Sequence, residues 1–577
     1  MKKIYSTVIL LTVFMLSSTI AQASDAVLEK LLKLESAGFI YGVKEHIPKY
    51  REANIKPSEK VTSYEFFYNS PVEGGNSKNY IQMRGLLITN PDLDNPLEAK
   101  MNQVYVGGYS ISEIWDKTDD YSIKYDCVSE FAKRYGGNLV VLEHRYFGES
   151  WYDGMWDHME YCNAALAAED FAYIISTFRN NLFAKDNRMV FSGISKGGIA
   201  TSIQAVKYPD DADLFVPYSG PWCNSPYDDR LLAYLKQNTY ARPEFEGDIS
   251  CENYTKIVNC ISSDPDIRAE YEKWFLAIYD TSPKEVHSYS ISWPVFVQDL
   301  ASYMPRETMR TKMYYADQAF TTNEWAFYIA MGGMKYGTEY EDSLKAHPEA
   351  GPSQSLEYCK QVHAADTGRM TARHMVLKNP ADKISKDSIL SQDNIIYNYQ
   401  AKKELGYYKG VLLDSYYRDD EYGQKFKEED KQMIEKYGNF IDTANGMSRF
   451  TYSDALYKEI TAGIKTAKRP VIFIYGEDDF WTGAAIEDQY INNSTSWKRI
   501  MPAQNHNACI SDAPADMQNE IWTYTDAVLN LKTTAINAIV TDKASSTETV
   551  KARTVISNGR IVIMRGNKMY NLAGQEM

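Results

Sequence analysis

The sequence predicts an α/β protein in which a mostly parallel β-sheet is interrupted by a large, mainly helical cap. Two observations carry this prediction. Short apolar runs alternate with longer amphipathic runs over residues 24–221 and again over 451–535, and such alternation is typical of βαβ units. Between them, residues 222–450 are polar, rich in Tyr, Lys and Glu, and almost free of β-like runs. This favours a helical segment inserted into the sheet domain.

The individual elements follow from apolar runs of strand length and from amphipathic runs of helix length. In the first part, strands are predicted at Ser63–Asn69, Tyr80–Thr89, Gln103–Val106, Leu139–Glu143, Met189–Ser192 and Leu214–Pro217, and helices at Ser122–Tyr135, Asn163–Asn180 and Gly197–Lys207. In the cap, helices are predicted at Pro265–Tyr279 and Glu428–Tyr437. In the last part, strands are predicted at Val471–Tyr475 and Arg499–Met501, and helices at Ala484–Ile491 and Ala513–Leu531.

The end of the chain changes character at residues 545–577. A Ser/Thr-rich stretch precedes two β-like runs, Thr554–Ser557 and Arg560–Met564, which flank Asn558-Gly559. An Asn-Gly pair between such runs predicts a hairpin. The tail fits either a shortened C-terminal sorting module of a Gram-negative outer-envelope export system or a β-tail packed on the main domain.

Composition excludes one class of partner. The 577 residues contain 62 Lys and Arg against 77 Asp and Glu, a formal net charge of −15. A surface of this sign repels a phosphate backbone, so nucleic acid is not expected as a partner.

The first 23 residues have the pattern of a secretory signal peptide. Lys2 and Lys3 precede the mostly apolar run Ile4–Ile20, and Ala21-Gln22-Ala23 offers a cleavage site of small residues. The alternative is a membrane anchor, because the run approaches the length of a span. No later run is long and apolar enough to cross a bilayer. We therefore expect an exported protein of the periplasm, cell surface or medium, without a transmembrane segment after cleavage.

Seven cysteines remain, and an odd number cannot pair completely within one chain. Cys251 and Cys260 bracket a short segment and form the best candidate for a local bridge, although sequence does not define connectivity. None of the cysteines has zinc-ligand spacing, so neither a metal nor a cofactor is expected.

A candidate nucleophile lies in Gly193-Ile194-Ser195-Lys196-Gly197. This Gly-x-Ser-x-Gly motif follows an apolar strand and opens a helix, the strand–turn–helix setting in which such a serine is exposed above a sheet. The glycines are needed because a side chain in so sharp a turn would clash with neighbouring backbone. The alternative is a glycine-rich turn without catalysis.

A nucleophilic serine needs a base, and in this setting the acid and then the histidine follow the serine along the chain. His506 follows the predicted strand Arg499–Met501, and no other histidine follows residue 374. The alternative is a surface histidine. The acid should follow the preceding strand, where Glu477, Asp478 and Asp479 stand in a row. We choose Asp479, with Asp478 as the second candidate, and this choice rests partly on the resemblance described below.

The oxyanion donors should be the N–H of Lys196, after the nucleophile, and an N–H from the loop behind an early central strand. Gly107-Gly108-Tyr109 follows the strand Gln103–Val106, and paired glycines allow a close approach to substrate. The second donor is therefore the N–H of Gly108 or Tyr109. Paired glycines also occur in ordinary turns.

Several segments, in order, closely resemble the secreted bacterial prolyl tri/tetrapeptidyl aminopeptidases, and more distantly prolyl carboxypeptidase and dipeptidyl peptidase II. These segments are Glu143–Ser150 (EHRYFGES), Asn163–Ala165, Ser195–Gly198 (SKGG), Tyr208–Asp211 and Tyr475–Trp481. The resemblance covers roughly residues 40–225 and 465–515 and implies an α/β-hydrolase fold with Ser195, Asp479 and His506 as its triad. The chain has Asp479-Phe480-Trp481 where the family usually has Asp-Pro-Trp.

The resemblance implies a serine exopeptidase that releases short peptides from a free N-terminus, often after proline. The inserted helical block would act as a cap that narrows access and excludes folded proteins. Glu143 or Glu149 could hold the α-ammonium of the peptide, although an ion pair between Glu143 and Arg145 is an equal alternative. Trp222 and Trp481 could form an apolar wall for a proline ring, or pack in the core.

Two other functions stay open. The same triad and oxyanion hole would serve an exported esterase. A catalytically silent binding protein of the envelope would keep the fold without the chemistry.

Overall fold

The computed structural model describes most of the predicted sheet domain and part of the insertion. The described residues are 26–46, 62–90, 93–111, 126–234, 393–406, 419–429 and 451–531, without residues 227, 232, 478, 493, 503 and 505, together with the single positions 265 and 432 and the backbone of 552–557, 560–565 and 568–570. The predicted signal peptide, the helix Pro265–Tyr279 and the pair Cys251 and Cys260 lie outside them. The helical cap over 222–450 therefore stays a prediction.

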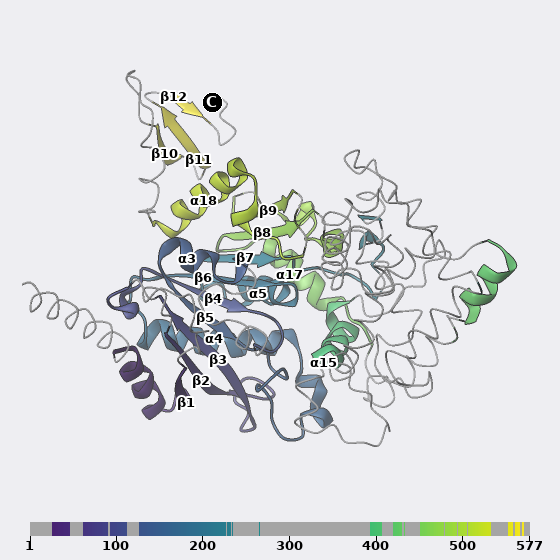
Figure 1. The fold of residues 1–577 in the computed structure, drawn as a ribbon, viewed down its shortest axis with the longest axis horizontal. Helices are drawn as coiled ribbons and strands as arrows, with labels where there is room; N and C mark the ends of the chain where they lie inside the picture. The colour runs from purple at the N-terminus through teal and green to yellow at the C-terminus, as the bar shows by residue number, and fades with distance from the viewer. Residues whose placement is uncertain are drawn as a thin grey trace, which may run out of the picture.

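One nine-stranded sheet forms the centre of the molecule, in the order β1-β2-β3-β5-β4-β6-β7-β8-β9 (Figure 1). The pairs β1–β2, β2–β3 and β3–β5 are antiparallel. From β5 onward, through β4, β6, β7, β8 and β9, all adjacent strands are parallel. Their bounds are β1 Tyr41–His46, β2 Thr62–Pro71, β3 Tyr80–Thr89, β4 Met101–Val106, β5 Asn138–Leu142, β6 Arg188–Ile194, β7 Leu214–Tyr218, β8 Val471–Gly476 and β9 Ser496–Met501. This mainly parallel sheet with interleaved helices confirms the predicted α/β-hydrolase fold.

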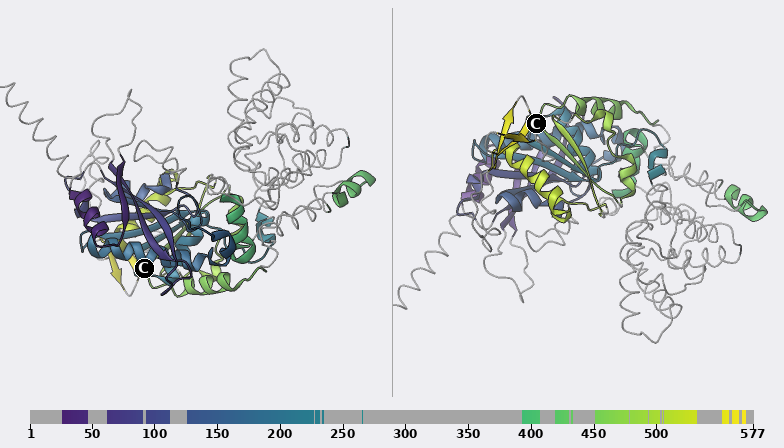
Figure 2. Two further views of the ribbon diagram at one scale, coloured as in Figure 1. Left: turned by 90° about the horizontal axis from the view of Figure 1, so that it is seen from below. Right: turned by 90° about the horizontal axis from the view of Figure 1, so that it is seen from above.

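Helices cover both faces of the sheet (Figure 2). On one face, α4 (Ala164–Asn181), α5 (Lys196–Lys207) and α17 (Ala455–Lys465) bury Ile174, Ile203 and Ile460 in one core cluster. On the other face, α3 (Glu130–Tyr135) and α18 (Ala515–Leu529) bury Phe131 and Trp522 in a second cluster.

Strand β6 shows why the central strands read as continuous apolar runs. Its residues alternate between the two cores: Met189 and Phe191 pack in the first cluster and Val190 packs in the second. A parallel strand with helices on both faces buries every side chain, so its sequence lacks polar alternation.

Two differences from the predicted elements stand out. Strand β1 was not predicted; it pairs only with β2, at the edge of the sheet. The helix predicted at Ala484–Ile491 is wrong, because the chain there forms two 3-10 turns, Phe480–Ala484 and Asp488–Tyr490. Ile486 donates its backbone N–H to the Tyr475 hydroxyl (3.1 Å), and the Ile486 carbonyl accepts from Lys498 Nζ (3.0 Å). Tertiary partners thus engage the backbone groups that a helix would use.

The predicted C-terminal hairpin is confirmed. Strands β10 (Ala552–Ser557) and β11 (Arg560–Arg565) pair antiparallel with Ser557 opposite Arg560, and β12 (Lys568–Tyr570) completes a three-stranded sheet. Across the part of the chain that the structure describes, no helix combines the length and the apolar character of a membrane span.

Candidate active site

Ser195 lies in a sharp turn between the end of β6 and the start of α5. Its backbone has φ 58° and ψ −122°, a conformation that side-chain-bearing residues rarely adopt. The Ser195 N–H donates to the Tyr218 carbonyl (2.9 Å), and its own carbonyl accepts from the Ile199 N–H (3.1 Å). Strain of this kind costs ~1–3 kcal/mol and persists only where the surroundings impose it.

The glycines of the motif are required by close backbone contacts. A Cβ on Gly193 would lie 2.4 Å from the Val106 carbonyl oxygen, and one on Gly197 would lie 1.9 Å from the same oxygen. The pairing of Val106 with Gly193 in neighbouring parallel strands imposes this approach. The turn at Ser195 can therefore form only with glycine at both positions.

Asp479 follows β8 and is held by its own turn. The residue is 2% exposed. Its Oδ1 accepts the Trp481 N–H (3.1 Å), which leaves Oδ2 to face His506. His506 Nδ1 lies 2.9 Å from Asp479 Oδ2. The structure thus brings Asp479 and His506 together, whereas Asp478 lies outside the described residues.

His506 follows β9, and its side chain is 24% exposed. Because Nδ1 faces Asp479, Nε2 is the ring nitrogen left to exchange protons with a neighbouring group. Ser195, Asp479 and His506 follow the carboxyl ends of the parallel strands β6, β8 and β9, which open at the same edge of the sheet.

A buried glutamate that sequence analysis missed holds the loop of His506. Glu130, at the start of α3, accepts the N–H groups of Ile510 (3.1 Å) and Ser511 (3.2 Å), and it also accepts the hydroxyl of Tyr218. Tyr218 ends β7 and supplies the carbonyl that holds Ser195. The loops of Ser195 and His506 therefore share one buried anchor, which no local motif indicates.

The loop after β4 packs directly on the turn at Ser195. Gly108 has φ 79°, and a Cβ there would lie 2.6 Å from the Gly197 nitrogen and 2.8 Å from the Lys196 carbonyl carbon. The backbone of Gly108-Tyr109 is thus in contact with the peptide group that follows Lys196. This is the neighbourhood required of two oxyanion donors.

Glu143 is fully buried and already engaged by its surroundings. Its Oε1 accepts the Ile111 N–H (3.0 Å), and its Oε2 accepts the Glu149 N–H (2.8 Å) and the Ser150 hydroxyl (2.9 Å). Burial raises the pKa of Glu143 to about 7. The carboxyl group ties loop 143–150 to the loop behind Gly108 and Tyr109. The side chain of Glu149 is partly exposed, while its carbonyl accepts from Gln82 (3.0 Å).

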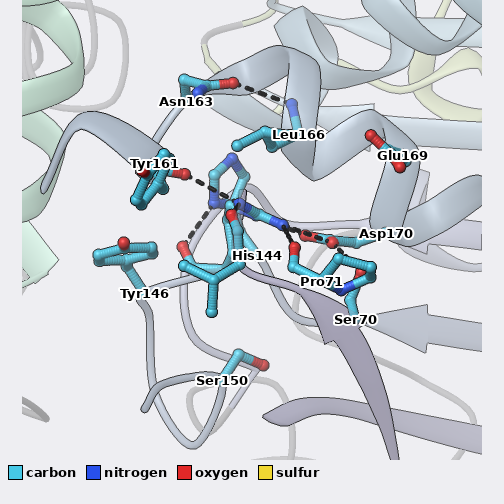
Figure 3. A network of polar contacts seen from close by, with 12 residues as sticks. Ser70, Pro71, His144, Tyr146, Ser150, Tyr161, Asn163, Leu166, Glu169 and Asp170 are labelled. Carbon is cyan, nitrogen blue, oxygen red and sulfur yellow. Dashed lines mark hydrogen bonds and ion pairs between the residues drawn. The ribbon is translucent and has the colours of Figure 1, made fainter. Parts of the chain in front are cut away.

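The alternative ion pair between Glu143 and Arg145 is wrong. Arg145 instead forms a bidentate ion pair with Asp170, in which both N–O distances are 2.7 Å (Figure 3). Its remaining donors reach the carbonyls of Pro71, Val72 and Tyr161. Glu143 and Arg145 are close along the chain, but both lie beyond the end of β5, and Asp170 on α4 engages the Arg145 guanidinium instead.

His144 belongs to this network and not to the candidate site. Its Nδ1 lies 2.9 Å from the Arg145 carbonyl (Figure 3), and its ring packs edge-on against Phe147. Burial, reinforced by the nearby Lys196 ammonium, holds the pKa of His144 well below its usual value.

The two tryptophans lie in neighbouring loops but in different clusters. Trp222 is 3% exposed and packs in the first core cluster, and its backbone N–H donates to the Ala484 carbonyl (2.7 Å). Trp481 is partly buried against Cys223, Leu231 and Ala484. Trp222 therefore packs as a core residue, and Trp481 is the more accessible of the two.

The four cysteines among the described residues, Cys127, Cys162, Cys223 and Cys509, are buried free thiols. Within the same part of the chain, no group of three His, Cys, Asp or Glu side chains could hold a metal ion.

Comparison with known proteins gives one family match. Residues 105–225 match the model of the family described as serine carboxypeptidase S28. The match spans well under half of the chain but includes Gly108, Tyr109, the segment Glu143–Ser150 and Ser195. It supports a serine hydrolase of the peptidase class. Among curated proteins, none matches the sequence.

Solved structures of low identity are also similar. They include a peroxisomal alpha-beta-hydrolase from Saccharomyces cerevisiae (10% identity, 82% of this chain and 91% of that chain, TM-score 0.32). A proline iminopeptidase from Mycobacterium smegmatis has 11% identity over 80% of this chain and 99% of that chain, with a TM-score of 0.30. A rice cell wall degrading esterase from Xanthomonas oryzae, solved as a mutant, has 13% identity over 87% of this chain and 98% of that chain, with a TM-score of 0.30.

Proposed function

We propose that this protein is a serine peptidase in which Ser195 is the nucleophile, His506 the general base and Asp479 the orienting acid. One observation carries the proposal. A serine in a strained turn shares its sheet edge with a histidine whose Nδ1 lies 2.9 Å from a buried aspartate. A carboxylate in this place fixes the tautomer of the imidazole and stabilises the imidazolium that forms during attack.

The reaction runs through an acyl-enzyme. Ser195 Oγ attacks the scissile carbonyl carbon and passes its proton to His506 Nε2. The oxyanion of the tetrahedral intermediate accepts hydrogen bonds from the Lys196 N–H and from the N–H of Gly108 or Tyr109. His506 then protonates the leaving amine as the C–N bond breaks. A water molecule hydrolyses the ester by the same steps, giving its proton to His506, and Ser195 is regenerated.

The substrate is a peptide with a free N-terminus, from which the enzyme releases fragments of two to four residues, with a preference for proline. The resemblance of the segments around Glu143, Ser195 and Asp479 to prolyl tri/tetrapeptidyl aminopeptidases supports this substrate class. The leader at residues 1–23 supports export to the periplasm, cell surface or medium. The partly buried Trp481 beside Asp479 suits an apolar wall.

A carboxypeptidase is the second candidate, because the matched family model describes serine carboxypeptidases. The two activities differ in which charged end of the peptide the enzyme requires. A carboxypeptidase needs a free α-carboxylate and accepts a blocked amine, whereas an aminopeptidase has the opposite requirement.

The test compares four substrates with wild type and Ser195→Ala. The first is Ala-Ala-Pro linked to a fluorogenic amine, and the second is its N-acetylated form. The third is an N-acetylated peptide that ends in Pro-Ala with a free carboxylate. The fourth is p-nitrophenyl acetate. Cleavage of the first substrate alone, abolished in Ser195→Ala, is the expected result. Cleavage of the third alone establishes the carboxypeptidase, and turnover of the ester without any peptide establishes the esterase. Turnover that is equal in wild type and Ser195→Ala, or absent on all four, would contradict the proposed function.

A further inference from the structure

The side chain of Lys196 is buried beside the candidate oxyanion loop and not in solvent. Lys196 directly follows Ser195 and is 3% exposed. Its Nζ donates a 2.5 Å hydrogen bond to the carbonyl oxygen of Gly108. One residue therefore offers its backbone N–H at the turn and holds the opposite loop by its side chain.

The direction of the Gly108 carbonyl determines the direction of the next N–H. In a trans peptide the C=O and N–H bonds point to opposite sides, so the oxygen of Gly108 and the N–H of Tyr109 diverge. Gly108 has φ 79° and no Cβ, so its own stereochemistry does little to prevent rotation of the following peptide group. The hydrogen bond from Lys196 supplies the constraint that Gly108 lacks.

The surroundings of Lys196 are built to keep an ammonium group in place. Its Nζ lies 3.8 Å from the centre of the Phe147 ring and 5.3 Å from that of Tyr109, within the range of cation–π attraction. The partly buried Glu404, whose carboxyl accepts the Ala164 N–H (2.8 Å), interacts electrostatically with Lys196. A buried cation requires such compensation.

We propose that Lys196 is a positioning residue for the oxyanion hole: its ammonium group holds the Gly108 carbonyl so that the Tyr109 N–H is the second oxyanion donor. This proposal rests on the proposed function and resolves the choice between Gly108 and Tyr109. This role differs from a purely structural one, because replacing Lys196 should weaken stabilisation of the tetrahedral intermediate and not binding of the substrate in its ground state.

The test uses the full-length protein as wild type, Lys196→Met, Lys196→Arg and the control Lys403→Met. Lys403 is also partly buried, and its Nζ donates to the Glu160 carbonyl (2.6 Å), but it does not hold Gly108. For each protein, kcat and KM are measured with Ala-Ala-Pro linked to a fluorogenic amine, and the inhibition constant is measured with phenylboronic acid, which forms a tetrahedral adduct with a nucleophilic serine. Thermal unfolding verifies that each variant is folded at the assay temperature.

In Lys196→Met we expect kcat to fall about 100-fold, near the effect of losing one oxyanion donor, with KM within about threefold of wild type. The inhibition constant for phenylboronic acid should rise by a similar factor. Lys196→Arg should recover kcat to within about tenfold of wild type, since a guanidinium can also donate to Gly108. Lys403→Met should change kcat by less than about threefold.

A folded Lys196→Met that keeps kcat within threefold of wild type would overturn the proposal. An equal loss in Lys403→Met, or a loss confined to KM, would also overturn it. If Lys196→Met does not fold, Lys196→Leu, which also lacks a donor, replaces it under the same criteria. Wild type that shows no Ser195-dependent turnover would overturn the proposed function instead, so the two failures are distinguishable.

Discussion

The pair of Asp479 and His506 shows how much single residues decide in this site. Asp479 is almost fully buried, and its two oxygens have separate tasks: Oδ1 holds the Trp481 N–H and Oδ2 faces His506. The turn after β8 therefore fixes the carboxylate before any substrate binds. Sequence order pointed to this region, but three consecutive acids follow the strand there. Geometry brings Asp479 to the histidine.

Replacing Asp479 by Asn should lower kcat by about 10³- to 10⁴-fold while the protein stays folded, because an amide favours the wrong imidazole tautomer. The exposed Asp488, which pairs with Lys498, provides the control as Asp488→Asn. Steady-state kinetics on the substrate found in the peptide test measure the effect. Equal activity of the two variants would show that Asp479 does not orient the base.

The partly buried Glu404 makes stability depend on pH. Burial raises the pKa of Glu404 to about 7 from an ordinary value of 4.5, so the folded state binds a proton that the unfolded state has already released between these values. This contribution to stability is present below about pH 4.5 and is lost as the pH rises to about 7.

Glu404→Gln should remove that loss, because a glutamine oxygen can still accept the Ala164 N–H. Relative to wild type, the free energy of unfolding of the variant should be higher by up to about 3 kcal/mol at pH 8 and unchanged at pH 4.5. Urea unfolding at both pH values measures the difference. The exposed Glu459, as Glu459→Gln, is the matched control. A gain that is the same at both pH values would contradict the assigned cause.

At the scale of elements, helix α3 matters because its first residue binds both the segment that carries His506 and the side chain of Tyr218. Glu130 begins the helix and engages two N–H groups of the segment that carries His506, and also the hydroxyl of Tyr218. The contact joins residues 380 positions apart. It was not predictable, because the sequence around Glu130 reads only as an amphipathic helix. The apolar runs of the central strands and the motif at Ser195 are local, and for that reason they were predictable.

Glu130→Ala leaves these buried donors without an acceptor, so we expect a loss of about 2–4 kcal/mol in the free energy of unfolding. We also expect kcat to fall about tenfold as His506 loses its alignment. The control is Glu520→Ala on α18, which removes a partly exposed ion pair with Arg499 and should cost less than about 1 kcal/mol. Unaltered kcat in a destabilised Glu130→Ala would limit Glu130 to a structural role.

At the scale of the whole molecule, the order of the parallel strands creates the site. Strands β4, β6 and β8 are separated by long stretches of sequence, and β9 follows β8 closely, yet the carboxyl ends of all four lie along one edge. That arrangement follows from alternating strands and helices, so the sequence could predict it. The Arg145–Asp170 pair and the contact of Lys196 with Gly108 depend on tertiary packing, and no periodicity indicates them.

The central claim is that Ser195 is the activated nucleophile of this site. The most direct measurement is the intact mass of the protein after treatment with diisopropyl fluorophosphate, which transfers its phosphoryl group to an activated serine with loss of fluoride. We predict one adduct per chain on Ser195 in wild type, no adduct in Ser195→Ala, and at least about 100-fold slower labelling in His506→Ala. Wild type that stays unlabelled, or an adduct that persists in Ser195→Ala, would contradict the claim.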